Sequence, residues 1–204
     1  STDLPCRCGE MRGQAHTLES FVAAILIVGG LIFATQVTAV TPLSASTSNQ
    51  HIENQQQATV DGLLATSAKK GTLAEAVLYW NSTNETFEGA PKNGVYAEGP
   101  PNELGTALDR TLSGRLIAFN VNVRYSTENG SAVEPMVRMG EPSANAVSTT
   151  RSIGLYNGSK LTGGDSRTLH EIDEDPNAEF YAPDIDADGQ LYNVVEVEVI
   201  AWRK

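Results

Sequence analysis

Residues 21–40 read FVAAILIVGGLIFATQVTAV, and this stretch decides the organisation of the chain. Its 20 residues carry no charge, and Gln36 is the only strongly polar side chain among them. As an α-helix they would span about 30 Å, which is the thickness of the hydrocarbon core of a bilayer. No other stretch of the 204 residues is as hydrophobic, so the sequence predicts one membrane segment.

The charges beside this segment set its expected orientation. Arg7 and Arg12 precede it, and no Lys or Arg follows it until Lys69. The positive-inside rule therefore predicts a single-pass protein of the cell membrane, with its N-terminus in the cytoplasm and residues 49–204 outside. The whole chain has 25 acidic and 14 basic residues, a net charge of −11, which argues against nucleic acid as a partner.

Three interpretations of the segment remain open from hydropathy alone. It could be a secretory signal peptide cleaved near Ala39, although it is longer than the usual apolar region of about 7–15 residues. It could be a plain membrane anchor. It could also be a helix that is cut on its cytoplasmic side and kept as an assembly element.

The residues before the segment favour the third interpretation. Met11-Arg-Gly-Gln-Ala-His-Thr-Leu-Glu19 resembles the class III signal peptide of archaeal type IV pilins, in which a prepilin peptidase removes a short basic leader. The resemblance implies cleavage between Gly13 and Gln14, or after Gln14, which would place Glu19 fifth in the mature chain. It also implies that Glu19 pairs with the freed amino terminus of a neighbouring subunit, because a carboxylate at the bilayer edge needs a partner charge.

The resemblance to haloarchaeal pilin-like proteins extends from Met11 to the end of the chain. It includes the stretches 41–56, 76–81, 117–121, 142–147 and 191–202. It implies a subunit of a cell-surface filament for adhesion or contact, with like or related subunits as partners. The domains expected are a leader (1–13, of which 1–10 is read as lying before the true start at Met11), a helix and linker (14–48) and an external domain (49–204).

Periodicity predicts that the external domain begins with helices. Pro42 and the Ser/Thr-rich run from Thr41 to Ser48 suggest a break or a stiff kink after the membrane segment. A second helix then ends at a C-cap, Gly71, and a third begins with a capping box, Thr72-x-x-Glu75. A further helix near 104–112 has Asn102 as its N-cap. The residues that recur at helical spacing in the second helix, and make it modestly amphipathic, are Ile52, Gln56, Val60, Leu63, Leu64 and Ala68.

Alternating patterns then predict an antiparallel sheet, so the fold class is α+β. The strands are expected at 117–125, around 133–139, within 146–156 and at 191–202. A three-residue loop around Asn129-Gly130 would pair Val123 with Val137 and keep one face apolar. Pro135 makes the second strand an edge strand or a broken one.

An acidic stretch precedes the last strand. Between residues 165 and 188 there are nine acidic residues and one basic residue. Asp184, Asp186 and Asp188, followed by Gly189, resemble the start of a calcium loop, but the bidentate Glu of such a loop is absent from its twelfth position. A Ca²⁺ ion is therefore a candidate cofactor, and a solvated acidic loop is the simpler interpretation.

Four N-x-[ST] sequons lie after the membrane segment, at Asn81, Asn84, Asn129 and Asn157, and are candidates for N-glycosylation. No nucleophile elbow, P-loop, dinucleotide fingerprint or His-x-x-x-His pair is present, so we expect no enzyme and no catalytic residues. The leading hypothesis is a pilin-like surface subunit. The alternative is an anchored surface protein that never polymerises and binds a ligand or partner with its outer domain.

Overall fold

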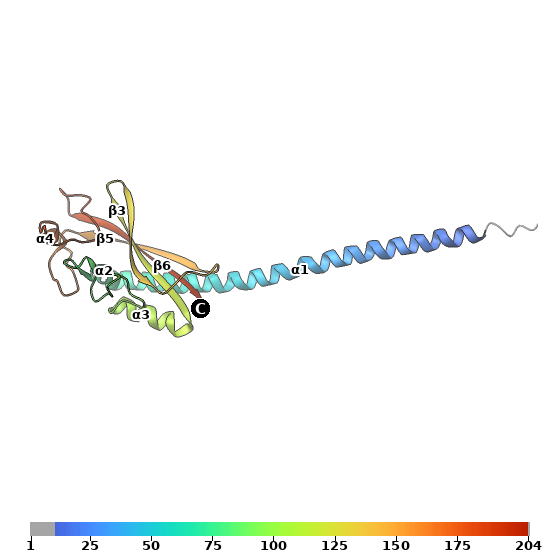
Figure 1. Cartoon of the computed structure of the whole chain (residues 1–204), viewed down its shortest axis with the longest axis horizontal. Coiled ribbons are helices and arrows are strands. Elements are labelled where there is room, and N and C mark those ends of the chain that lie inside the picture. The colour runs from blue at the N-terminus through green and yellow to red at the C-terminus, as the bar shows by residue number, and fades with distance from the viewer. Residues whose placement is uncertain (1–10, 204) are drawn as a thin grey trace, which may run out of the picture. The chain divides into compact units, whose positions relative to one another are not determined.

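The computed structural model describes the backbone of residues 11–203 and the side chains of residues 17–34 and 50–203 (Figure 1). The chain divides into two compact units, Ser1–His51 and Ile52–Lys204. Helix α1 (Met11–Lys70) contributes to both units. The second unit has the α+β fold that the sequence predicts, with helices packed on an antiparallel sheet.

The sheet has four strands in the order β4-β3-β6-β5, and each neighbouring pair is antiparallel. The last strand of the chain therefore lies in the middle of the sheet, between the first and the third. All four predicted strands are present, and Pro135 lies on the edge strand, as expected. The bounds are β3 (Ile117–Thr127), β4 (Gly130–Arg138), β5 (Val147–Tyr156) and β6 (Leu191–Arg203).

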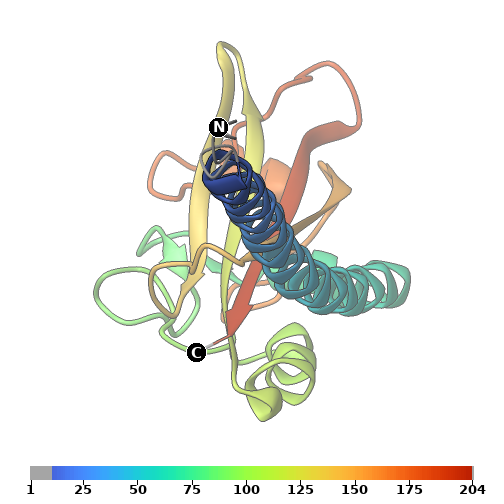
Figure 2. The same cartoon turned by 90° about the vertical axis from the view of Figure 1, so that its right-hand side faces the viewer.

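One face of the sheet forms the core against the C-terminal part of α1. Val121 pairs with Val199 across β3 and β6, and both side chains are fully buried. Val60 and Leu64 of α1 are also fully buried and belong to the same apolar cluster. The predicted helical spacing thus identifies the buried face of this part of α1. In Figure 2, β6 (red) lies between β3 and β5.

The opposite face of the sheet is polar. Arg124 on β3 lies 4.0 Å from the Glu196 carboxylate and 3.9 Å from the Glu198 carboxylate, both on β6. Glu198 also accepts hydrogen bonds from Asn122 and Ser148. The alternation of valines and glutamates in β6 therefore separates a dry face from a charged one.

Short helices and strands outside the four-stranded sheet also contribute residues to the core. Asn102 caps α3 as predicted, with its side chain accepting a hydrogen bond from the backbone N–H of Gly105 at 3.1 Å. Trp80 packs edge-on against Phe87 and Tyr181, with ring centroids 5.2 and 5.1 Å away, so this tryptophan is a core residue. The remaining elements are α2 (Thr72–Val77), β1 (Trp80–Asn81), β2 (Thr86–Phe87), α3 (Glu103–Thr111), the 3₁₀ turn η1 (Ser113–Arg115) and α4 (Leu169–Asp173).

Of the two outcomes predicted at Pro42, a break is wrong, because α1 continues through this residue, whereas a kink stays a prediction. A proline removes one intrahelical hydrogen bond, and Ser and Thr each lower helix propensity by only tenths of a kcal/mol. Ending the helix would require a second unfavourable nucleation step on the far side. The Pro, Ser and Thr residues of this segment therefore do not end the helix, although their composition suggested that they would.

The predicted three-residue hairpin loop is also wrong. Thr127 pairs with Gly130, so the loop has two residues, and Val123 lies opposite Glu134. The register then shifts between Val121 and Asn122, and this bulge brings Val137 opposite Val121. The extra residue in β4 restores the apolar face that the longer loop was invoked to explain.

The predicted capping box of α2 does not form. Gly71 is the N-cap, in the left-handed conformation at φ 83°, and no side chain caps this helix. Because Gly71 alone joins the two helices, Thr72 is already helical, and its hydroxyl donates to the Ser67 carbonyl oxygen. Gly71 therefore ends α1, as predicted, and leaves no extended position for a Thr cap.

Candidate functional site

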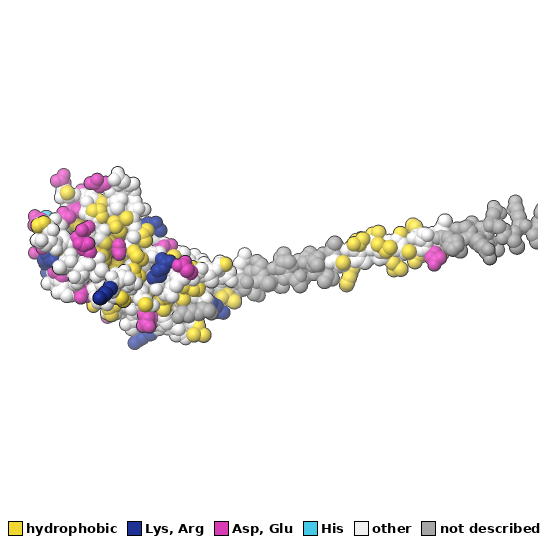
Figure 3. Space-filling model, in the orientation of Figure 1, with side chains coloured by type: hydrophobic (Ala, Val, Ile, Leu, Met, Phe, Trp, Pro, Cys, Tyr) yellow, Lys and Arg dark blue, Asp and Glu magenta, His cyan; other side chains and the backbone are white. Residues whose placement is uncertain are grey.

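The apolar window of α1, Thr17–Ala34, is the strongest functional feature of the described chain. These 18 residues have a mean hydropathy of 2.1, and none of their side chains is buried (Figure 3). The window is long and apolar enough to cross a membrane. Its exposed large side chains are Leu18, Phe21, Val22, Ile25, Leu26, Ile27, Val28, Leu31, Ile32 and Phe33.

The free-energy cost of leaving this window in water is large. Burying one such side chain contributes about 1.5–3 kcal/mol, so ten of them amount to roughly 15–30 kcal/mol. That exceeds the net stability of a typical domain, about 5–15 kcal/mol. The window therefore favours an apolar surrounding, such as the hydrocarbon core of a bilayer.

Two glycines in the window do not contact any part of the described chain outside their own helix. A Cβ atom added at Gly29 or Gly30 would meet no atom within 4 Å, so packing within this chain does not require glycine at either position. Gly30 and Ala34 also have the small-x-x-x-small spacing that lets two membrane helices approach closely.

Of the residues predicted for leader cleavage and assembly, the structure describes the side chain of Glu19 alone. Glu19 lies in the first turns of the window with its side chain exposed. Gly13 and Gln14 lie in α1, but their side chains are outside the described residues, as is the whole stretch 1–10. Glu19 is the last charged residue before Glu53, so a single carboxylate marks the polar end of the window.

The structure does not gather the three aspartates of the candidate calcium loop, Asp184, Asp186 and Asp188, into one group of ligands. Across residues whose side chains are described, no group of three His, Cys, Asp or Glu is placed to hold an ion. Asp186 and Asp188 are exposed, and the Asp184 carboxylate accepts a hydrogen bond from the backbone N–H of Asp186 at 2.8 Å. The geometry is that of a turn stabilised by its own aspartate.

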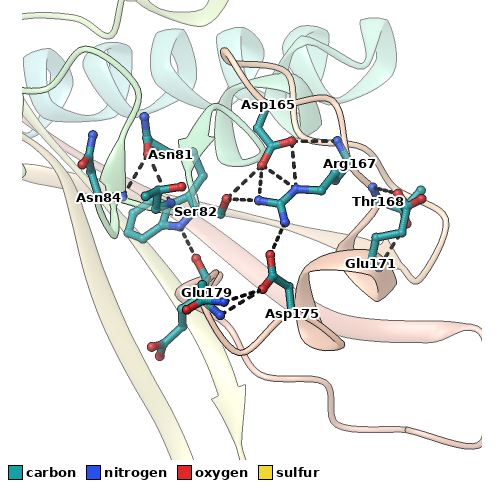
Figure 4. A network of polar contacts seen from close by, with 12 residues as sticks. Asn81, Ser82, Asn84, Asp165, Arg167, Thr168, Glu171, Asp175 and Glu179 are labelled. Atoms are coloured by element: carbon teal, nitrogen blue, oxygen red, sulfur yellow. Dashed lines mark hydrogen bonds and ion pairs between the residues drawn. The ribbon is translucent and has the colours of Figure 1, made fainter.

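A different part of the acidic stretch is organised by Arg167 (Figure 4). Its guanidinium donates to the Asp165 carboxylate at 2.7 Å and to the Asp175 carboxylate at 2.7 Å. It also donates to the Ser82 hydroxyl at 2.9 Å, and that hydroxyl donates to Asp165 at 2.9 Å. One arginine thus joins the acidic stretch to the β1–β2 segment 85 residues earlier.

This network predicts a loss of stability in acid. The hydrogen bonds from Arg167 hold the pKa of Asp165 well below its usual range, and the Asn177 N–H and Arg167 lower the pKa of Asp175. A depressed carboxylate pKa stabilises the fold above the unfolded-state value, about 3.9, and that contribution is lost as pH falls. Asp165→Asn should lower the free energy of unfolding at pH 7 by about 1–3 kcal/mol.

The pH profile distinguishes this account from general destabilisation. In thermal unfolding between pH 7 and pH 2.5, the wild-type midpoint should fall steeply below pH 4, and the Asp165→Asn midpoint should fall less. Asp188→Asn, at an exposed carboxylate of the same stretch, is the matched control. If the unfolding midpoints of Asp165→Asn and the wild type fall by the same amount below pH 4, Asp165 is not the titrating group.

The four sequons differ in whether their amide nitrogen is available. Asn81 donates from Nδ2 to the Glu88 carboxylate at 3.1 Å, and Asn157 donates from Nδ2 to the Gly189 carbonyl oxygen at 3.2 Å. Both side chains are half-buried, whereas Asn84 and Asn129 are exposed in turns. Since glycosylation attaches the sugar at Nδ2, the folded domain presents Asn84 and Asn129 as acceptors.

If the native protein is N-glycosylated, we therefore expect glycan on Asn84 and Asn129 and none on Asn81 or Asn157. Intact-mass measurement of the wild type beside Asn84→Gln and Asn129→Gln should show each variant losing one glycan mass. Asn81→Gln and Asn157→Gln are the matched controls. Loss of mass from a control variant, with both exposed sequons unmodified, would contradict this assignment.

Comparison with known proteins adds a family but no activity. A family profile matches residues 12–201, which cover the apolar window and the α+β unit. No curated protein and no solved structure matches the chain. The chain belongs to the family of unknown function DUF7288.

Proposed function

We propose that this protein is a pilin-like surface subunit. The helix α1 first anchors it in the cell membrane, with the N-terminus in the cytoplasm and the α+β unit outside. After removal of the leader by a prepilin peptidase, the same helix packs with α1 of like or related subunits in the core of a surface filament. The α+β unit is displayed on that filament for adhesion or contact, in a structural and not a catalytic role.

The observation that carries this proposal is the exposed apolar window Thr17–Ala34. A membrane anchor would explain the hydropathy equally well, and the position of Glu19 at the polar end of the window is what favours assembly over anchoring alone. Gly29 and Gly30 support close contact with another helix. Glu19 supplies the charge that the freed amino terminus of a neighbour would bind.

Glu19→Ala tests assembly separately from anchoring. The variant should remain in the membrane fraction at the wild-type level, because alanine makes the window no less apolar. Its amount in filaments sheared from the cell surface should fall at least tenfold, since the register between neighbours loses its charge pair. Both amounts can be measured by quantitative immunoblotting of the two fractions.

Glu53→Ala is the matched control, because Glu53 is the next acidic residue along α1 and lies outside the window. It should be found in sheared filaments at the wild-type level. Equal filament yields for Glu19→Ala and the wild type would contradict the pilin-like role. The alternative, an anchored protein that never polymerises, predicts no sheared filaments from the wild type at all.

A further inference from the structure

Leu116 has an exposed apolar side chain and an unfavourable backbone conformation. It follows η1 and adopts the left-handed conformation, φ 59° and ψ 34°, with its side chain 74% exposed. The hydrogen bond from the Ile117 N–H to the Leu112 carbonyl oxygen, 3.2 Å, closes a turn of the kind in which glycine is usual. Glycine at this position would remove about 1 kcal/mol of backbone strain and one exposed leucine.

Two arginines flank this leucine. Arg115 is the preceding residue, and Arg203 on β6 is paired with Ile117, the residue after Leu116. Both arginines are exposed, and neither forms an ion pair with any residue whose side chain is described. We call Arg115, Leu116 and Arg203 the knob.

A hollow of about 360 Å³ has the complementary chemistry. Half-buried Tyr125, buried Tyr192 and the exposed acidic residues Asp173 and Glu179 line it, and we call these four residues the hollow. Burial raises the pKa of Tyr192, and the charges of Asp173, Asp184 and Glu179 raise it further, as expected in a negative potential. Within the described part of the chain, neither Asp173 nor Glu179 has a cationic partner.

The knob and the hollow lie at opposite ends of the same two strands. Leu116 directly precedes β3, whereas Tyr125 is near its other end; Arg203 ends β6, whereas Tyr192 is near its start. Nine residues of strand separate Leu116 from Tyr125, which is about 30 Å at 3.3 Å per residue. The knob therefore cannot reach the hollow of its own chain.

We propose that the knob of one copy enters the hollow of the next copy in the filament. Leu116 packs on the partly exposed ring of Tyr125, and the two guanidinium groups lie beside the Asp173 and Glu179 carboxylates. Because the two surfaces differ, the contact is heterologous and repeats from copy to copy, as a filament requires. This inference rests on the proposed pilin-like function and deepens it by naming a contact between the α+β units.

A cysteine pair tests the contact directly. In the full chain with Cys6 and Cys8 replaced by serine, Leu116→Cys is combined with Ala178→Cys at the lining of the hollow. Oxidised sheared filaments should show a ladder of covalent oligomers on a non-reducing gel, because every copy carries both halves of the contact. Leu116→Cys with Ser152→Cys, an exposed residue of β5 outside the hollow, should show at most dimers.

Leu116→Gly provides the second measurement. The thermal midpoint of this variant should equal or exceed the wild-type value, whereas its filament yield should fall at least tenfold. Val133→Gly, which removes another exposed apolar side chain, should leave the yield unchanged. Charge reversal adds a rescue, since Arg115→Glu and Glu179→Arg should each lower the yield and should restore it when combined.

The outcomes separate this contact from the function on which it rests. Wild-type filaments without the 116–178 ladder, or with an equal 116–152 ladder, would overturn the knob-and-hollow contact and leave the pilin-like role standing. An unchanged filament yield for Leu116→Gly would also overturn the contact. Absence of wild-type filaments would overturn both proposals together.

Discussion

Replacing Ile27 and Val28 together by arginine should remove the protein from the membrane fraction. Both side chains lie near the centre of the apolar window and are exposed. An arginine at the centre of a spanning helix costs about 2.5–3.5 kcal/mol on the insertion scale, so the pair costs roughly 5–7 kcal/mol. On the same insertion scale, whose values per side chain are smaller than those for transfer from water to hydrocarbon, the ten large apolar side chains contribute about 0.3–0.6 kcal/mol each, or roughly 3–6 kcal/mol in total. The free energy of inserting this helix into a membrane therefore changes from favourable to unfavourable.

The measurement is the fraction of the full chain that stays with membranes after an alkaline carbonate wash. We expect at least a tenfold loss for the double variant. Thr150→Arg with Ser152→Arg adds the same charge at exposed positions of β5 and should leave the fraction unchanged. Retention of the Ile27 and Val28 variant after the wash would show that the window is not the anchor.

Leu64→Ala should have the largest effect on the fold of the α+β unit. Leu64 is fully buried in the cluster that joins α1 to β3 and β6. Removing a buried leucine side chain costs about 2–5 kcal/mol, because the transfer free energy is lost and a cavity remains. Such a loss is a large part of the total stability of a typical domain.

Leu63→Ala is the matched control for this substitution. Leu63 is the neighbouring residue but is only half-buried, so its truncation should cost about 1 kcal/mol or less. Urea unfolding of both variants in the full chain can be followed by the fluorescence of Trp80 and Trp202, which are buried. Equal losses would show that the face of α1 turned to the sheet is wrongly assigned.

The parts of the fold that the sequence predicted are those with a strong local pattern. The valines of β6 alternate with glutamates over five residues, 195–199, and that alternation requires one buried face and one solvent-exposed face. The spacing of Val60 and Leu64 likewise requires a helix with one buried side. The apolar window is visible from hydropathy alone, since no tertiary contact is needed to explain it.

The errors arose where a local rule competed with a longer-range effect. Helix propensity at Pro42 was outweighed by the cooperativity of α1. The hairpin register was inferred from strict alternation, but the bulge beside Met136 shifts that alternation by one residue. Thr72 had the sequence of a cap, but the one-residue connection at Gly71 left it inside the helix.

The contacts that the sequence could not show join residues far apart in the chain. Arg167 contacts Ser82, 85 residues away, and no spacing rule relates the two. The availability of Asn84 and Asn129, against the engaged amides of Asn81 and Asn157, depends in the same way on tertiary neighbours. The exposure of Leu116 follows from the sign of its φ angle, which a leucine in a sequence does not reveal.

The central claim is that the apolar helix is kept after a short leader is removed. The most direct test is the N-terminus of the native protein, determined by mass spectrometry of the membrane fraction and of the sheared-surface fraction. We predict a chain that begins at Gln14 or Ala15 and retains the whole window Thr17–Ala34. A mature chain that begins near Val40 would lack both the window and Glu19, and it would contradict anchoring and assembly alike.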